Sequence, residues 1–287
     1  MIHAAAPSND LSPDRLRLAP GEPVSPELAG WRYLSFALRQ IQPRASYPIG
    51  GDGMETLVVT LTGGVRVGEM QLDGRESVFD GGAWAAYLPP GQRSTIGSDG
   101  GATVAVASAP ASARKGVAVN PIRVTPADLR VEARGAGNAT RQINHIVEPD
   151  FPADRLLAVE VYTPSGNWSS WPPHKHDTDA MPEEAVLEEV YAYQFRRPEA
   201  WGVQRLYRRD GSRDAVWAVR HGEVVLVTDG YHPFVATHGD DAYYLNVLAG
   251  DRRTMACSFD PDLDFVRESW AEMSPDPRVP LVPPLGR

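Results

Sequence analysis

The chain has few cysteines and lysines, and it has no strongly basic segment. Its 287 residues include one cysteine, Cys257, so no disulfide can form within it. Only two lysines are present, Lys115 and Lys175, which disfavours covalent catalysis through an amine. The formal net charge is -9 and no run is rich in Lys or Arg. Binding to a phosphate backbone therefore has no electrostatic support, and we expect no nucleic-acid partner.

Long apolar runs are also missing. None approaches the roughly 20 residues that a membrane-spanning helix needs. The first 20 residues lack the apolar centre of a secretory signal peptide. With one cysteine and no disulfide framework, the sequence predicts a cytoplasmic protein without a membrane partner.

Short segments rich in Val, Thr, Tyr and Trp make up most of the chain, separated by turns that use many of its 26 Gly and 26 Pro. This pattern is typical of all-β proteins, and its spacing favours a barrel or jelly roll. Helical composition is confined to residues 179–189 and 264–272. The predicted strands are 31–38, 56–62, 65–72, 84–88, 103–108, 156–162, 189–195, 202–207, 215–219, 223–227 and 243–248.

The two halves repeat a strand, turn and strand order, seen in GGAWAAYLPPGQRS and in HGEVVLVTDGYHP. Internal duplication therefore predicts two β-barrels of jelly-roll type. The predicted division is an N-terminal extension 1–28, a first barrel 29–115, a crossing segment 116–150, a second barrel 151–260 and a Pro-rich tail 261–287.

Histidines are concentrated in the second half, where six of the seven lie at or beyond His145. Two of them form His174-Lys175-His176, and residues two apart on a strand share a face at about 6.5 Å. An isolated His-x-His is more often a plain surface feature. Here it is followed by His232 in a Gly-Tyr-His-Pro turn and by the carboxylates Glu183, Glu184, Glu188 and Glu189. Three imidazoles and one carboxylate can hold a divalent ion and leave room for a substrate.

These residues resemble the two motifs of the cupin superfamily, which are His-x-His followed by Glu, and a strand followed by a turn and His. Thr228 replaces the usual proline, and the gap from His176 to the glutamates is longer than in ordinary cupins. The strings GNWSSWPPHKHD, LEEVYAYQF, QRLY, DGYHP and YYLNVLAG are similar to the 5-deoxyglucuronate isomerase family of bacterial inositol catabolism. The resemblance covers residues 130–255 and implies a bicupin, a chain of two cupin barrels.

The resemblance implies one divalent metal, with zinc expected and manganese or iron as alternatives. It maps the metal ligands onto His174, His176, His232 and one glutamate. We expect Glu189, because it begins a strand whose alternate residues would line the barrel, with Glu188 as the competing ligand.

A small acidic sugar is the substrate that the resemblance implies, converted from 5-deoxyglucuronate to 5-dehydro-2-deoxygluconate. Arg205 is the expected clamp for its carboxylate, since guanidinium pairs bidentately with carboxylate. Tyr243 is expected to reach the cavity in preference to Tyr244. The general base stays open among Glu183, Glu184, Glu160 and a metal-bound hydroxide.

The first barrel is expected to be metal-free, because Ser94 occupies the place of a ligand histidine and no histidine lies between His3 and His145. We expect a homo-oligomer. Two other functions are compatible with the residues, a non-haem metal dioxygenase and a sugar-binding cupin without turnover. Oxygen uptake would identify the first, and a glutamate and Arg205 facing away from the metal would favour the second.

Overall fold

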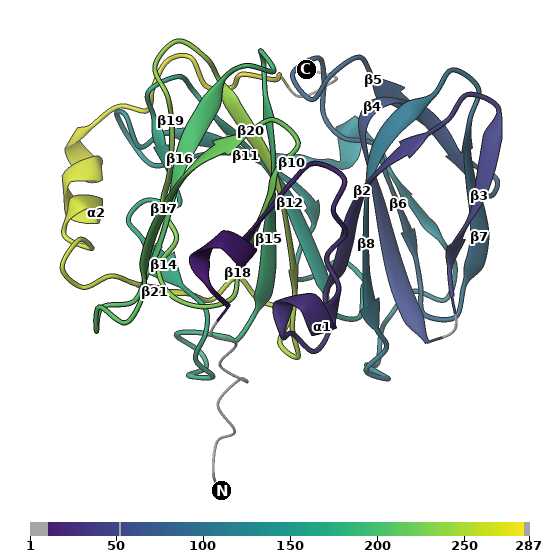
Figure 1. Cartoon of the computed structure of the whole chain (residues 1–287), viewed down its shortest axis with the longest axis horizontal. Helices are drawn as coiled ribbons and strands as arrows, with labels where there is room; N and C mark the ends of the chain where they lie inside the picture. Colours follow the sequence, from purple (N-terminus) through teal and green to yellow (C-terminus); the bar gives the residue numbers. More distant parts are fainter. Residues whose placement is uncertain (1–10, 52, 284–287) are drawn as a thin grey trace, which may run out of the picture.

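Two antiparallel β-barrels lie side by side in the computed structural model, which describes residues 11–51 and 53–283 (Figure 1). The start of the predicted extension 1–28 and the last residues of the tail 261–287 fall outside the described residues. The N-terminal barrel is blue in Figure 1 and the C-terminal barrel is mainly green. The all-β prediction is confirmed.

The N-terminal barrel is built around β4, a 14-residue strand that pairs with β5, β6, β7 and β8. The predicted strand 65–72 is wrong, because the chain reverses at Gly68 between β4 and β5, where φ is +55°. The strands are β2 (Ser35–Ile41), β3 (Ala45–Gly50), β4 (Met54–Val67), β5 (Met70–Arg75), β6 (Ala85–Leu88), β7 (Arg93–Ser98), β8 (Ala102–Pro110) and β9 (Ile122–Val124).

The C-terminal barrel combines a seven-stranded sheet in the order β1-β18-β15-β20-β12-β11-β10, a four-stranded sheet in the order β13-β19-β16-β17, and the pair β14-β21. The strands are β1 (Arg17–Leu18), β10 (Arg130–Arg134), β11 (Arg141–Val147), β12 (Leu156–Thr163), β13 (Trp168–Ser169), β14 (His174–Lys175), β15 (Glu188–Phe195), β16 (Trp201–Tyr207), β17 (Asp214–Arg220), β18 (Val224–Val227), β19 (Phe234–Ala236), β20 (Ala242–Ala249) and β21 (Ser258–Phe259).

The connection between the barrels is shorter than the predicted segment 116–150. β9 pairs with β6 of the N-terminal barrel, and β10 and β11 already belong to the C-terminal sheet. Only the stretch around the 3₁₀ turn Pro126–Asp128 separates them. The N-terminal segment also crosses over, since β1 pairs with β18 before the chain enters the N-terminal barrel through α1 (Pro26–Ala29). The C-terminal barrel therefore includes a strand from the N-terminal end of the chain.

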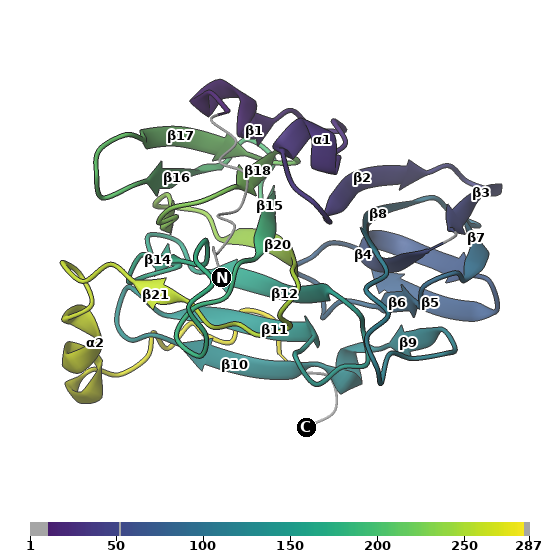
Figure 2. The same cartoon turned by 90° about the horizontal axis from the view of Figure 1, so that it is seen from below.

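In residues 11–51 and 53–283, helix is confined to short turns, which include Pro13–Arg15 near the N-terminus. The predicted helix 179–189 is wrong, because these residues form a loop that ends where β15 begins. The predicted helix 264–272 is reduced to α2 (Val266–Ser269) and the 3₁₀ turn Trp270–Glu272. Figure 2 places α2 at the end of the molecule farthest from the N-terminal barrel. Within the described residues, no helix is long and apolar enough to cross a membrane.

Buried charges join the two barrels. Arg75 of β5 donates from Nη2 to Glu160 Oε1 of β12 at 2.5 Å, and the side chains are 2% and 0% exposed. Glu55 of β4 accepts the backbone N–H groups of residues 154–156 at 2.6–2.9 Å. One apolar core extends across this contact, so every residue of β12 is buried on both sheet faces. The tight packing holds the C-terminal sheet in a fixed position.

Candidate metal centre

Strand alternation on β15 separates the two glutamates that the sequence leaves in competition. Glu189 points into the C-terminal barrel with Tyr191, and its side chain is 2% exposed. Glu188 points the other way and accepts the backbone N–H groups of residues 32–34 at 2.5, 2.9 and 2.8 Å. Glu189 is therefore placed to bind a ligand in the barrel, whereas Glu188 anchors the segment that leads into β2.

His176 and His232 meet Glu189 inside the barrel. Glu189 Oε2 lies 2.8 Å from His176 Nε2 and 3.2 Å from His232 Nε2, and one donor atom from each residue lies within 4.8 Å of the others. Asn246 of β20 donates to Glu189 Oε1 and fixes the second carboxylate oxygen. The three side chains form a buried cluster of the size of a metal site.

Backbone carbonyls orient both imidazoles. His176 Nδ1 lies 3.0 Å from the Leu187 carbonyl, and His232 Nδ1 lies 3.0 Å from the Gly230 carbonyl. A proton on each Nδ1 leaves Nε2 with a free lone pair, which is the usual state of a metal-binding histidine. Gly230 is required in this turn, because its φ is +77° and a Cβ would lie 2.5 Å from the Tyr207 carbonyl oxygen.

The donor set fits a divalent cation. His232 Nε2 is buried and makes no hydrogen bond among the described residues, despite its proximity to Glu189. A buried unpaired ring nitrogen is costly unless it has a ligand. Two imidazole nitrogens and a carboxylate oxygen suit zinc, manganese or iron.

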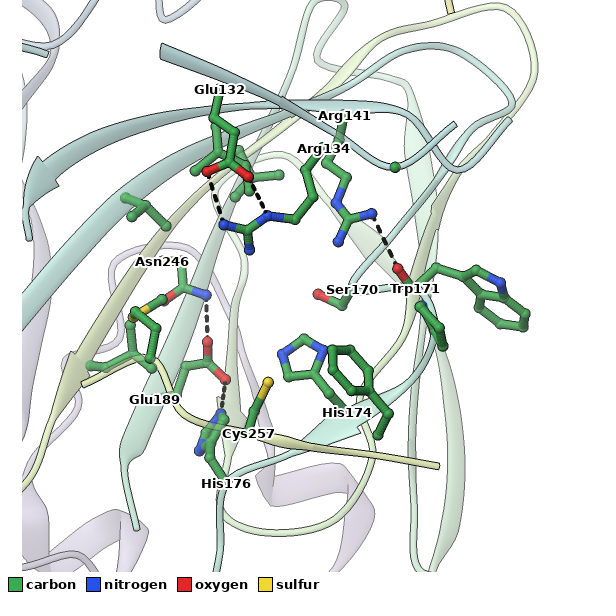
Figure 3. Close-up of a pocket in the computed structure, with 18 of the residues that line it drawn as sticks. Glu132, Arg134, Arg141, Ser170, Trp171, His174, His176, Glu189, Asn246 and Cys257 are labelled. Carbon is green, nitrogen blue, oxygen red and sulfur yellow. Dashed lines mark hydrogen bonds and ion pairs between the residues drawn. The ribbon is translucent and has the colours of Figure 1, made fainter. Parts of the chain in front are cut away.

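His174 lines the same cavity but lies outside the three-residue cluster. Its ring centroid is 4.6 Å from that of His232 and 6.3 Å from that of His176. Figure 3 shows His174 and His176 at the wall of the cavity. The strand expected to align His174 with His176 stops at Lys175. The four predicted ligands thus occupy one region, and the assignment of all four to one ion stays a prediction.

Burial and mutual contact shift the ionisation of these groups. Burial lowers the pKa of His174 well below its usual value, and the neighbouring histidines add to this effect. Burial also lowers the pKa of His232, although Glu189 opposes the shift. Burial is the largest single effect on His176 and opposes its protonation, but the charge of Glu189 and the hydrogen bonds to Glu189 and to the backbone together outweigh burial and raise the pKa. In the metal-free protein, a proton is therefore held best between His176 and Glu189, where a cation would displace it.

A cavity of about 760 Å³ opens above the cluster, within the usual range for small-molecule sites. Its walls come from β10, β11, β12, β15 and β20, from the loop before β15 and from the segment of α2. The polar and aromatic lining residues include Glu132, Arg134, Arg141, His145, Ser170, Glu183, Tyr191, Tyr244, Asn246 and Cys257.

The predicted inward orientation of Arg205 is wrong. Its Nε and Nη2 donate to the two carboxylate oxygens of Asp214 at 2.8 Å each, and both side chains are about half exposed. The neighbouring Gln204 faces inward instead, and its amide donates to the carbonyl of His232 at 2.8 Å. Side chains on β16 alternate between the two faces as expected, but Arg205 lies on the outer face.

We predict that Arg205→Lys leaves kcat/KM for the substrate within about twofold of the unchanged protein. The side chain lies at the surface away from the cavity, and exposed ion pairs contribute little to stability. Steady-state kinetics of the two proteins checks this. A loss of tenfold or more would show that the Arg205–Asp214 pair acts on the site at a distance.

Tyr243 also lies outside the cavity, contrary to the prediction. Its hydroxyl donates to Glu160 Oε1 at 3.0 Å, in the contact between the barrels. Tyr244 lines the cavity and stacks on Tyr191 at 4.4 Å between ring centroids. The sequence could not choose between the two tyrosines, because both faces of β20 are buried.

The structure separates the three carboxylates considered as a general base. Glu160 is paired with Arg75 between the barrels, and Glu184 accepts hydrogen bonds from Lys175 Nζ at 2.8 and 3.0 Å. Glu183 lines the cavity. Another titratable group at the wall is His145, whose Nε2 lies 3.0 Å from Glu132.

Three residues with evident contacts to the site were missed by sequence reasoning: Asn246, Gln204 and Arg141. Asn246 stands two residues after Tyr244 on the same face of β20, so the burial of both faces concealed it together with Tyr244. Gln204 required the phase of β16. Arg141 lay in the stretch expected to cross between the barrels, so no site role was considered for it.

Two antiparallel barrels with a histidine and glutamate cluster in one of them define the chain as a bicupin. The formate complex of oxalate decarboxylase from Lactobacillus farciminis has the same architecture, with a TM-score of 0.59 over 85% of this chain and 88% of that chain. At 11% identity, this likeness concerns the fold alone. The predicted fold class is confirmed.

The KduI/IolB family model matches residues 17–266, and the chain belongs to this family. It is 39% identical to the 5-deoxy-glucuronate isomerase of Geobacillus kaustophilus over 86% of this chain and 90% of that protein. It is 35% identical to the 5-deoxy-glucuronate isomerase of Halalkalibacterium halodurans over 89% of this chain and 97% of that protein. The crystal structure of an IolB-like protein from Salmonella typhimurium superposes with a TM-score of 0.82 at 32% identity, covering 88% of this chain and 99% of that chain.

Proposed function

We propose that this chain is a metal-dependent 5-deoxyglucuronate isomerase, which interconverts 5-deoxyglucuronate and 5-dehydro-2-deoxygluconate in the breakdown of myo-inositol. The names of its relatives support the isomerase reaction. The observation that carries the metal dependence is the buried His176, Glu189 and His232 cluster at one side of a substrate-sized cavity. A homo-oligomeric state and a cytoplasmic location stay predictions.

The proposed metal ligands are His176, Glu189 and His232, with His174 as the fourth. Zinc is the ion that the family resemblance implies, since the nitrogen and oxygen donors by themselves also suit manganese or iron. The bound ion would act as a Lewis acid that favours removal of the proton next to the substrate carbonyl.

The chain's own residues orient the ligands and can move a proton. Asn246 holds Glu189, and two backbone carbonyls hold His176 and His232 in the tautomer with a free Nε2. Glu183 and the His145–Glu132 pair line the cavity and are candidates to transfer a proton between neighbouring carbons. The group that acts as the base must come within hydrogen-bond distance of the proton that it removes from the substrate carbon.

The test is to incubate the purified protein with 5-deoxyglucuronate, follow formation of the ketone by NMR, and measure bound metal by elemental analysis. We expect isomerisation without oxygen uptake, loss of turnover on chelation and recovery on adding zinc. Oxygen consumption would identify a dioxygenase, and binding without turnover a sugar-binding protein. Full activity in verified metal-free protein would refute the metal dependence.

A further inference from the structure

A buried arginine on the cavity wall has unused hydrogen-bond donors. Arg141, on β11, is 6% exposed. Both of its hydrogen bonds come from Nη1, to the carbonyls of Ala139 and Trp171 at 3.1 Å each. Among the described residues, its Nε and Nη2 have no protein partner, and no carboxylate lies within ion-pair distance. The side chain is therefore held in place while one edge of the guanidinium stays available.

The other buried arginines of the described chain are all matched. Three pair with carboxylates, and the fourth donates from all three side-chain nitrogens to backbone carbonyls. These partners are Glu160 for Arg75, Asp251 for Arg155, Asp229 for Arg213, and the carbonyls of residues 148, 149, 151 and 156 for Arg253. Among the buried arginines of the described chain, Arg141 is the one whose Nε and Nη2 contact neither a carboxylate nor a backbone carbonyl.

An uncompensated buried cation is costly, and the cost is visible in its ionisation. Burial lowers the pKa of Arg141 to about 10. At neutral pH the guanidinium remains charged, and a buried charge of this kind is stabilised by an anion that enters the site. The cavity wall therefore carries a buried positive charge that no protein group among the described residues neutralises.

Strand alternation aims Arg141 at the substrate cavity. Residues 141, 143 and 145 of β11 line it, whereas Gln142 and Asn144 point to the opposite face. Figure 3 shows Arg141 and Arg134 across the cavity from Glu189 and His176. Arg134 is already paired with Glu132 at 2.7 Å, so Arg141 provides the unneutralised charge. One end of the cavity is thus cationic, and the other carries the candidate metal ligands.

We propose that Arg141 binds the carboxylate of the acidic sugar through its Nε and Nη2 edge, while the carbonyl end of the sugar faces His176, Glu189 and His232. Arg205 uses this same edge to bind both oxygens of Asp214. The proposal rests on the proposed isomerase function, and it assigns the specificity for a sugar acid over a neutral sugar to one side chain. Bidentate pairing also fixes the orientation of the sugar relative to the cluster.

The experiment compares the unchanged protein with Arg141→Gln and Arg141→Lys, and uses Arg205→Gln as a control that loses an exposed bidentate arginine. For 5-deoxyglucuronate, we expect kcat/KM to fall roughly ten- to a hundredfold in Arg141→Gln, because a charge-assisted pair is lost. Arg141→Lys should recover only part of the loss, since an ammonium cannot reproduce the planar fork. The control should remain near the original value.

A binding measurement separates carboxylate recognition from a structural effect. The probes are D-glucuronate and D-glucose, titrated calorimetrically into each metal-loaded protein. We expect the unchanged protein to prefer D-glucuronate and Arg141→Gln to lose that preference, with D-glucose binding unaltered. Equal losses for both sugars, or no preference in the unchanged protein, would overturn the proposal. If Arg141→Gln fails to fold, Arg141→Lys decides the matter: a weakened preference for D-glucuronate with unaltered D-glucose binding supports the proposal, and an unchanged preference or an equal loss for both sugars overturns it.

The two proposals can fail separately. Normal turnover of 5-deoxyglucuronate by Arg141→Gln would overturn the carboxylate site and leave the isomerase function intact. An Arg141-dependent preference for D-glucuronate in a protein that does not isomerise 5-deoxyglucuronate would keep the carboxylate site and overturn the function.

Discussion

Glu189→Gln is expected to remove most of the bound metal and to lower kcat/KM by more than about a hundredfold. Changes to groups that only orient a metal ligand typically cost ten- to a hundredfold, so loss of a ligand should cost more. The amide also removes the negative charge that would balance a cation beside His176 and His232. Metal per chain after buffer exchange, measured with kcat/KM on the same sample, checks both parts.

Glu188→Gln is the matched control, because it makes the same chemical change one residue away. Glu188 accepts three backbone N–H groups from residues 32–34 and lines no part of the cavity. This variant should lose about 1–3 kcal/mol of unfolding free energy while keeping its metal and most of its turnover. The ligand assignment would be wrong if Glu188→Gln lost the metal and Glu189→Gln retained it.

Glu160→Gln is expected to lower the unfolding free energy by about 3–5 kcal/mol, because it leaves the charge of Arg75 buried between the barrels without its partner. The side chain of Arg75 is 2% exposed. Urea unfolding followed by fluorescence and by circular dichroism measures the loss. Asp214→Asn, which breaks the exposed pair with Arg205, should cost less than about 1 kcal/mol.

The double variant Arg75→Met with Glu160→Met tests the cause of that loss. If the cost comes from an unpaired buried charge, removing both charges should recover part of the stability lost in Glu160→Gln. Recovery will be incomplete, because Arg75 also donates to the carbonyls of Thr60 and Gly81. The losses of unfolding free energy in Arg75→Met and in Glu160→Met can be added and compared with the loss in the double variant. A larger loss in the double variant would mean that the polar contacts themselves hold the barrels together.

Local patterns in the sequence were sufficient for the fold class and for the location of the histidine and glutamate cluster. Alternating short strands predicted two β-barrels, and the placement of the histidines predicted which barrel contains that cluster. The choice of Glu189 over Glu188 followed from alternation along a strand that begins at a recognisable point. Each of these inferences depends on residues close together in the chain, where backbone geometry limits the possible arrangements.

Where sequence reasoning failed, the deciding contacts come from distant segments. Residues 179–189 have helical composition, but pairing of β15 with β18 and β20 makes their last residues a strand. Gln204 and Arg205 on β16 are both polar, so the sequence does not show which of them faces the barrel interior. The contact of Gln204 with the carbonyl of His232 identifies Gln204 as the inward residue. β12 and β20 are covered on both faces, which removes the alternation of apolar and polar residues that normally identifies the interior.

The sequence by itself determined that this chain forms two β-barrels with a histidine and glutamate cluster in the second. Tertiary structure alone decided that Tyr244 faces the cavity, that Arg205 faces solvent and that Arg141 lies across from the cluster. The physical reason is that strand periodicity fixes which residues share a face, whereas the identity of that face depends on the neighbouring strands and on the other barrel.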